Sequence, residues 1–372
     1  MSEVTRQGPR GKKPGRDAGG PATAADGDGT RRWRRGRKAE RPVVPEAEFT
    51  SYYGKPILNA PTWEARDIAG YFFLGGLAGG SSLLAAGADL TGRPALSRVA
   101  KAGAAAAGAL SVAALVHDLG RPARFVNMMR VFKVTSPMSV GSWLLGGYLP
   151  AAGVAAATAL TGRLPRIGSV ATAGAALLGP AVAAYTAVLI GDTAVPAWHD
   201  GYGELPFVFT GSAAMAAGGL GLLAAPAEES GPARNLALLG QVLEMVAFER
   251  MTRRIGLVAE PYRAGRGGRY IRAGQALAAF GATGAALSGV PAIPLGRSRR
   301  VLAAVSGAAL IGASAATRWG VFHAGLASAR DPKYTVVPQR KRLAERAAAT
   351  ARPAPGPERP AAGPGEATAR SG

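Results

Sequence analysis

The sequence predicts an all-α integral membrane protein, a bundle of eight transmembrane helices expected to form two groups of four. Eight stretches of about 20 apolar or small residues run from about Ile68 to Phe322, and short loops between them hold most of the charge. A hydrocarbon core of about 30 Å takes about 20 helical residues to cross. Because the membrane interior has no water to satisfy a bare backbone, these stretches must be helices.

Each expected span is rich in Gly and Ala, which is typical of helices that pack closely inside a bilayer. In the first span, Gly76 and Gly80 form a GxxxG pair and predict a close helix contact. The sixth span is the least apolar, since it contains Gln241, Glu244 and Glu249. The spans are expected at about residues 68–88, 99–116, 138–160, 167–190, 205–225, 233–250, 272–292 and 301–321.

The two ends of the chain predict disordered tails around a transmembrane domain at residues 49–327. Residues 1–48 carry twelve Lys or Arg, and residues 328–372 are rich in Ala, Pro, Arg and Glu. Neither end buries enough apolar surface to offset the chain entropy. The formal net charge of +21 would suggest nucleic-acid binding in a soluble protein. Here, basic tails that touch anionic membrane lipid are the favoured interpretation.

The distribution of Lys and Arg predicts the topology. The short loops on the two faces are almost equally basic, with ten and nine such residues. The heavily basic N-terminal tail therefore decides, and it predicts that both termini are cytoplasmic in a multi-pass protein of the cell membrane. In either orientation, the loops after the second, fourth and sixth spans share one face with both tails.

The residue inventory argues against a redox centre held by this chain. The chain has no Cys, which excludes a disulfide, a thiolate-bound iron–sulfur cluster and a Cys-based zinc site. A transmembrane haem takes axial ligands that face each other within the bundle. The three histidines, His117, His199 and His323, all fall at span ends or in loops. We therefore expect no haem and no metal, and any electrons must come from a partner and go to a diffusible carrier.

The shared face collects the most unusual residues. The loop after the second span begins His117-Asp118-Leu119-Gly120-Arg121, and the loop after the fourth runs from Asp192 to Trp198-His199. Acidic and basic groups at the edge of the hydrocarbon are costly unless they are paired. These residues are either structural ion pairs that fix helix ends, or a site where protonatable groups and aromatic rings meet an amphipathic ligand from the lipid.

Glu244 is the most deeply placed acid in the sequence. An acid inside a membrane helix is a candidate proton-relay group. The alternative is that the sixth span tilts or lies shallow, so that the carboxylate reaches an interface.

Several short motifs occur in fixed order over roughly residues 50–325. The motifs are Tyr52-Tyr53-Gly54-Lys55-Pro56, Pro61-Thr62-Trp63-Glu64, the run from Tyr71 to Gly79, Asp118-Leu119-Gly120-Arg121-Pro122, Ser136-Pro137-Met138-Ser139 with Gly141-Ser142-Trp143, and Thr193-Ala194-Val195-Pro196 with Trp198. In this order the motifs resemble those of the NrfD-type membrane subunits of polysulfide reductase-like complexes. Together they are much more specific than any one alone.

The resemblance implies an eight-helix subunit of an anaerobic respiratory oxidoreductase complex that lacks its own redox cofactor. It implies a quinone or quinol site near the membrane surface, where an iron–sulfur subunit docks. It also implies that a molybdopterin-type catalytic subunit often lies beyond that partner.

The resulting hypothesis is two-electron exchange between a menaquinone-like quinone and an iron–sulfur partner. Tyr71, His117 and Asp118 are the candidates to hydrogen-bond or protonate the head group, with Arg121 balancing the charge of Asp118. Asp192, Trp198 and His199 are expected to form the opposing wall or the docking surface. Histidine suits proton exchange because it titrates near neutral pH without help. No residue of this chain is assigned a catalytic role of its own.

Two other functions stay open from the sequence alone. A secondary transporter or ion translocator would suit Pro150 and Pro180 inside spans and the acid Glu244, although the two halves show no convincing repeat. A passive anchor that only holds an enzyme complex at the membrane would need none of the polar residues on the shared face.

Overall fold

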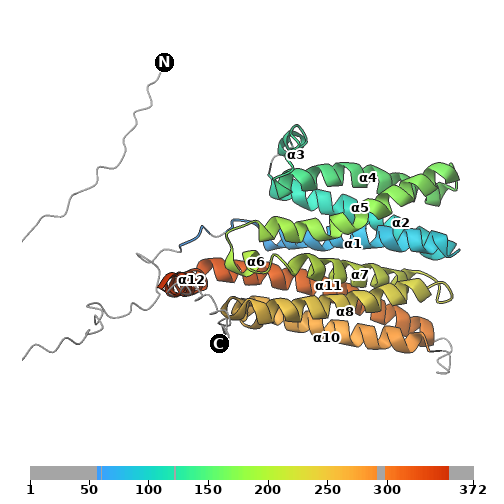
Figure 1. The fold of residues 1–372 in the computed structure, drawn as a ribbon. Helices are drawn as coiled ribbons and strands as arrows, with labels where there is room; N and C mark the ends of the chain where they lie inside the picture. The colour runs from blue at the N-terminus through green and yellow to red at the C-terminus, as the bar shows by residue number, and fades with distance from the viewer. Residues whose placement is uncertain (1–56, 60, 121–122, 291–297, 352–372) are drawn as a thin grey trace, which may run out of the picture. The chain divides into compact units, whose positions relative to one another are not determined.

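A computed structural model describes residues 57–59, 61–120, 123–290 and 298–351, and these residues form helices joined by short loops (Figure 1). The expected N-terminal tail at residues 1–48 and Arg121 lie outside the described residues. The long helices are α1 (Ala65–Leu90), α2 (Pro94–Asp118), α4 (Pro137–Thr161), α5 (Pro165–Gly191), α7 (Leu205–Ala224), α8 (Gly231–Arg254), α10 (Gly265–Ser288) and α11 (Ser298–Arg330). Shorter elements are α3 (Ala123–Met128), α6 (Pro196–His199), η2 (Gly256–Ala259), α9 (Glu260–Arg263) and α12 (Lys333–Ala351).

Six of the described helices, α1, α2, α4, α5, α7 and α11, are long and apolar enough to cross a membrane. The spans expected at 233–250 and 272–292 correspond to α8 and α10, which have sufficient length but do not reach the same apolarity. Arginines near their ends and polar residues such as Gln241, Glu244 and Gln275 account for this difference.

The long helices pack in two groups. One group contains α1, α2, α4 and α5, and the other contains α7, α8, α10 and α11. Figure 1 shows these groups as neighbouring layers, joined where α1 and α5 lie along α7. Since most loops are short, successive long helices run in opposite directions.

Proline and glycine account for several helix boundaries. Pro94, Pro137 and Pro165 open α2, α4 and α5, at a position where a missing N–H costs nothing. The hydroxyl of Ser136 accepts a hydrogen bond from the backbone N–H of Ser139 and caps α4. Gly162 ends α4 with φ 68°, a left-handed conformation that glycine adopts without strain.

The glycines of α1 allow close packing at the centre of the bundle, which confirms the contact predicted from Gly76 and Gly80. A Cβ atom on Gly80 would lie 2.6 Å from the carbonyl oxygen of Ala213 in α7, and one on Gly76 would lie 3.4 Å from the Cβ of Ala213. On another side of α1, Gly79 packs directly against the backbone of Gly179 in α5. Helix α1 is therefore the central element of the fold.

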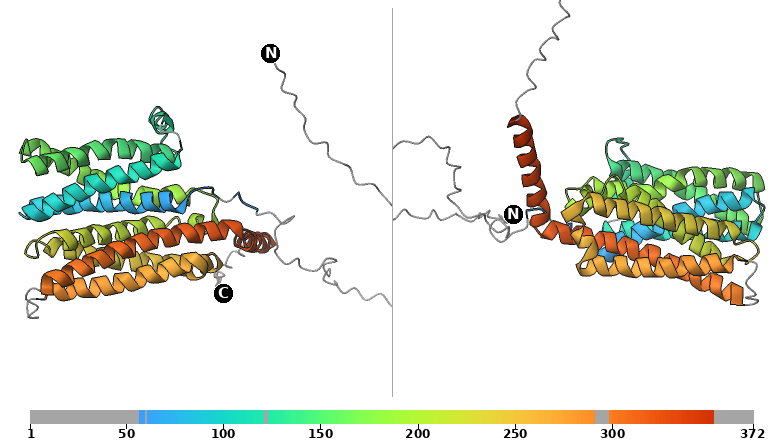
Figure 2. Two further views of the ribbon diagram at one scale, coloured as in Figure 1. Left: turned by 180° about the vertical axis from the view of Figure 1, so that it is seen from behind. Right: turned by 60° about the horizontal axis from the view of Figure 1, so that its bottom comes forward.

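The C-terminal part differs from the tail expected at 328–372. Helix α11 continues to Arg330, and α12 follows at Lys333–Ala351. Figure 2 shows α12 running across the direction of the bundle helices. Lys333 Nζ lies 2.9 Å from Glu260 Oε2 in α9, and Tyr334 is buried. These long-range contacts, which composition does not reveal, explain why the first part of this segment is ordered.

Candidate functional site

A cavity of about 100 Å³ lies at the end of the bundle where α1 begins and α2 ends. It brings together two of the predicted site residues, Tyr71 of α1 and Asp118 of α2. Most of the remaining wall is apolar or aromatic. The lining residues are Trp63, Ile68, Tyr71, Phe72, Leu115, Asp118, Leu119, Met128, Met138, Gly141, Ser142, Leu145, Tyr185 and Leu189.

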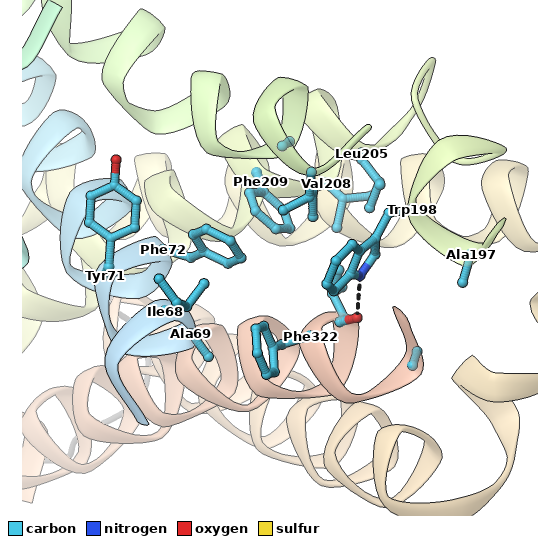
Figure 3. Close-up of a cluster of buried hydrophobic side chains, with 14 of the residues drawn as sticks. Ile68, Ala69, Tyr71, Phe72, Ala197, Trp198, Leu205, Val208, Phe209 and Phe322 are labelled. Carbon is cyan, nitrogen blue, oxygen red and sulfur yellow. Dashed lines mark hydrogen bonds between the residues drawn. The ribbon is translucent and has the colours of Figure 1, made fainter. Parts of the chain in front are cut away.

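Two tyrosines supply the polar atoms at the inner wall of this cavity. The rings of Tyr71 and Tyr185 meet edge to face, with their centroids 6.2 Å apart. Figure 3 shows the hydroxyl of Tyr71 pointing away from the ring of Phe72 and the buried cluster beyond it. The hydroxyl of Tyr185 is buried and has no hydrogen-bond partner among the described residues. The cavity therefore combines hydroxyl groups with the carboxyl group of Asp118.

His117 lies beside the cavity, on the outer surface. Its Nδ1 is 2.8 Å from Oδ2 of Asp67 in α1, and its side chain is 77% exposed, whereas that of Asp67 is 13% exposed. The pair joins the end of α2 to the start of α1. His117 thus connects the neighbourhood of Asp118 with the aqueous side, and it does not line the cavity itself.

Trp198 is a core residue. Its side chain is fully buried, and its indole N–H donates a 2.8 Å hydrogen bond to the carbonyl oxygen of Val321 in α11 (Figure 3). Its ring stacks on Trp63 with the centroids 6.0 Å apart and packs against Phe322. Trp198 was expected to form a wall of the site or a docking surface, but it lies in the core instead. It supports Trp63, which lines the cavity, from behind.

Asp192 and His199 lie on a second, more polar cavity at the same end of the bundle. This cavity has a volume of about 430 Å³ and is closed on one side by residues of α12, among them Tyr334 and Arg342. Nδ1 of His199 lies 3.1 Å from the carbonyl oxygen of Gly191. The predicted candidates thus divide between two cavities rather than forming the two walls of one.

Glu244 lies in the second helix group, far along the chain from the other candidates. Its Oε1 accepts a 2.7 Å hydrogen bond from the hydroxyl of Thr317 in α11. It also interacts electrostatically with Arg318, whose side chain is fully buried. The Arg318 guanidinium lies 3.7 Å from the centroid of the Phe209 ring and donates a 2.6 Å hydrogen bond to the Phe209 carbonyl oxygen. The structure therefore places this half-buried acid within electrostatic reach of a fully buried base.

An ion pair closes the end of the second helix group. Arg254, the last residue of α8, donates hydrogen bonds of 2.8 Å and 2.6 Å to the two carboxylate oxygens of Glu204. It also donates to the carbonyl oxygen of Asp200. This bidentate arrangement ties the loop before α7 to the end of α8.

A family model described as polysulphide reductase, NrfD, matches residues 61–251, just over half of the chain. The chain belongs to the NrfD family. Together with the six apolar helices, this makes it a multi-pass membrane protein, the membrane subunit of a respiratory oxidoreductase complex. The match includes Tyr71, Asp118 and Glu244. No curated protein matches the chain.

Arg318 is the residue of this NrfD protein that the sequence analysis missed. It stands in the run Ala315-Ala316-Thr317-Arg318-Trp319, inside the eighth expected span. A cationic side chain in such a span needs a partner, so its position alone was a usable signal. Which acid pairs with it depends on how α8 packs against the rest of the group. In the described part of the chain, no cluster of three or more acidic or histidine side chains could hold a metal ion.

The Glu204–Arg254 pair predicts a pH-dependent stability. The hydrogen bonds from Arg254 hold the pKa of Glu204 below its ordinary value. A lowered pKa in the folded state means that the pair stabilises the protein fully above about pH 4.3, the ordinary glutamate value. The contribution is lost as the pH falls through the lowered pKa, because the unfolded chain then binds the proton more readily.

We therefore expect Glu204→Gln to lower the stability at pH 7 by about 1 to 3 kcal/mol. The difference in melting temperature between the variant and the wild type should shrink as the pH falls below about 4. Thermal unfolding in detergent over a pH series measures it. A difference that stayed constant down to acidic pH would contradict the assignment, and Glu228→Gln, which changes an acid in the opposite loop, is the matched control.

Proposed function

We propose that the cavity between Tyr71 and Asp118 binds the head group of a quinone or quinol, and that this NrfD protein exchanges electrons between that carrier and an iron–sulfur partner subunit. The observation that carries the proposal is that α1 and α2 bring a buried phenol and a carboxyl group to one aromatic cavity at the end of the bundle. Sites for such ligands are mostly apolar, with a few polar groups that fix orientation.

The residues present fit a quinone head group. Its two ring oxygens accept hydrogen bonds, and the hydroxyls of Tyr71 and Tyr185 are donors. Trp63 and Phe72 offer aromatic surface for the ring. The cavity of about 100 Å³ is small for a bicyclic ring such as that of menaquinone. Met128 and Met138 line the cavity, and methionine side chains rearrange easily. We expect these two side chains to move when the ring enters.

Protons must reach the ring oxygens when the carrier is reduced, and leave them when it is oxidised. Asp118 can hold or release a proton at the cavity wall. His117 and its partner Asp67 lie next to it in contact with the aqueous side, so they are the proposed link to water. In this proposal Arg121 balances the charge of Asp118, and Glu244 is a second, more deeply placed relay.

The end of the bundle that holds this cavity is the proposed docking face for the iron–sulfur subunit. The short elements α3, α6, α9 and α12 all follow helix ends on this side (Figure 1). The cavity lined by Asp192 and His199 supplies a polar part of the surface. A molybdopterin catalytic subunit would bind beyond the iron–sulfur partner. We also propose that α8 and α10 cross the membrane, which makes eight spans with both termini cytoplasmic.

The test is quinol-dependent electron transfer by the complex purified from its membrane, with an artificial electron acceptor. Asp118→Asn removes the carboxyl group but keeps its size, and Tyr71→Phe removes one donor. We expect Asp118→Asn to lower turnover by about 100-fold or more, since a positioned proton-transfer group contributes about 10²- to 10⁴-fold. Tyr71→Phe should lower it by about tenfold, the contribution of one hydrogen bond. The melting temperature should change little.

Tyr148→Phe is the matched control, because Tyr148 is also a buried tyrosine but hydrogen-bonds to Ser82 away from the cavity. Its turnover should stay close to that of the wild type. If the protein is only a passive anchor, all three variants will turn over alike. Absence of a co-purifying iron–sulfur protein together with absence of quinol-dependent activity would refute the proposal.

A further inference from the structure

A separate cavity of about 380 Å³ lies between α8 and α10, with α11 contributing to its wall. Its volume falls within the range typical of ligand sites. The lining residues are Gln241, Glu244, Met245, Phe248, Glu249, Ile271, Gln275, Ala278, Ala279 and Thr317. Met245, Gln275 and Ala279 are exposed on the outside of the bundle, so the cavity opens sideways, where a membrane protein meets lipid.

This cavity lies deep in the bundle. Glu244 stands ten residues before the end of α8 at Arg254, and Gln275 stands ten residues after the start of α10 at Gly265. At about 1.5 Å per residue, both side chains are about 15 Å from the helix ends, near the middle of a core about 30 Å thick. Polar side chains at that depth need polar partners.

Two acceptor oxygens in the cavity wall lack such partners. Oε1 of Gln241 and Oε2 of Glu244 are buried and have no hydrogen bond within the described structure. Thr317 donates to the other oxygen of Glu244. Ser212 also lies near the carboxyl group, but its hydroxyl is 2.8 Å from that of Ser314. Buried polar atoms are normally satisfied. Nε and Nη1 of Arg318 are also buried without a hydrogen-bond partner, but Arg318 does not line the cavity. The two oxygens are therefore open to a donor that enters the cavity.

The charge of Arg318 favours the ionised form of Glu244. A guanidinium stays protonated, and a buried charge needs a counter-charge. Glu244 is the acid that interacts with Arg318. At rest its carboxyl group is then the carboxylate, which accepts hydrogen bonds and cannot donate one; it takes up a proton only in its proposed role as a relay.

We propose that this cavity binds the reduced, hydroquinone form of a membrane carrier and discriminates against the oxidised quinone. The hydroquinone has two O–H donors for Glu244 and Gln241, whereas the quinone has only acceptor oxygens and would face a carboxylate. Phe248 offers its ring for packing, and the lateral opening leaves room for an apolar tail. Lipids with hydroxylated head groups fit the donor requirement but remain at the membrane surface. The proposal extends the proposed function to a second site, and rests on it only for the class of carrier.

The experiment measures binding of 2-methyl-1,4-naphthohydroquinone and of its oxidised form to the full chain in lipid nanodiscs, by equilibrium titration. A photoreactive derivative of the hydroquinone maps the labelled peptides.

We expect two saturable sites for the hydroquinone, with label on α8 or α10 peptides at one of them. Gln241→Leu and Gln275→Leu should weaken hydroquinone binding at that site by about tenfold or more and leave quinone binding unchanged. Glu244→Gln, which introduces a donor, should reduce the preference for the hydroquinone.

Met245→Leu is the matched control, since it changes an apolar residue of the same wall. Gln275→Leu keeps the test valid if Glu244→Gln does not fold, because Gln275 is exposed. Equal affinity for both redox forms, or label confined to peptides around Tyr71, would overturn the proposal. Unchanged hydroquinone binding in Gln241→Leu and Gln275→Leu would do the same and would mean that water satisfies the two oxygens. Tyr71→Phe separates the two sites, because it affects only the cavity of the proposed function.

Discussion

Replacement of Arg318 by leucine is expected to lower the free energy of unfolding by about 3 to 5 kcal/mol. The guanidinium is fully buried between α11 and α7, where it donates to the carbonyl oxygen of Phe209 and lies over the Phe209 ring. Its removal leaves the carboxylate of Glu244 without a counter-charge inside the bundle. The large cost comes from that uncompensated charge rather than from the lost contacts alone.

The double variant Arg318→Leu with Glu244→Leu isolates the free-energy cost of the uncompensated charge. Since it removes both charges, it should be clearly more stable than Arg318→Leu alone. The measurement is unfolding of the purified protein in mixed detergent micelles by titration with a denaturing detergent. Arg98→Leu, on the exposed surface near the start of α2, is the control and should change stability by no more than about 0.5 kcal/mol. A double variant as unstable as the single one would show that the two charges do not compensate each other.

Apolar length and small-residue content predicted the helical membrane fold because both are local properties. The six helices that are long and apolar enough to cross a membrane differ from the expected spans mainly at their ends. Helices α8 and α10 are less apolar than these six helices, in part because they carry the polar residues of a cavity. The order of α12 depends on an ion pair between Lys333 and Glu260, and such a long-range contact leaves no mark on local composition.

Successive spans run in opposite directions, so the start of α1 and the end of α2 lie on one face. This alternation was the only basis in the sequence for expecting Tyr71 and Asp118 to lie close together. The sequence did not distinguish Trp198, which is buried, from its neighbour His199, which is exposed. Both lie in the same short segment around α6. The burial of Trp198 depends on its hydrogen bond to Val321 and its stacking on Trp63. Pairings of this kind between distant segments require the tertiary structure.

Gly79→Ala is expected to lower the free energy of unfolding by about 3 kcal/mol, at the upper end of the usual cost of overpacking. Gly79 of α1 faces Gly179 of α5 so closely that a Cβ atom would overlap the carbonyl oxygen of Gly179 and lie 3.1 Å from the backbone nitrogen of Ala183. Both obstacles are backbone atoms, so no side chain can rotate away. The added methyl group must separate α1 from α5, and α1 makes the most extensive contact between the two groups.

Gly87→Ala is the matched control, because a Cβ atom at that position of α1 meets no other atom within 4 Å. Within a helix, alanine is favoured over glycine by about 1 kcal/mol, so this variant should be as stable as the wild type or slightly more stable. The same gain acts at Gly79, so any loss of stability there reports on the helix contact alone. Unfolding midpoints of the two variants in the same detergent compare them directly. Equal midpoints would mean that α1 and α5 can separate at little cost, and that the close approach of their backbones does not hold the two helices together.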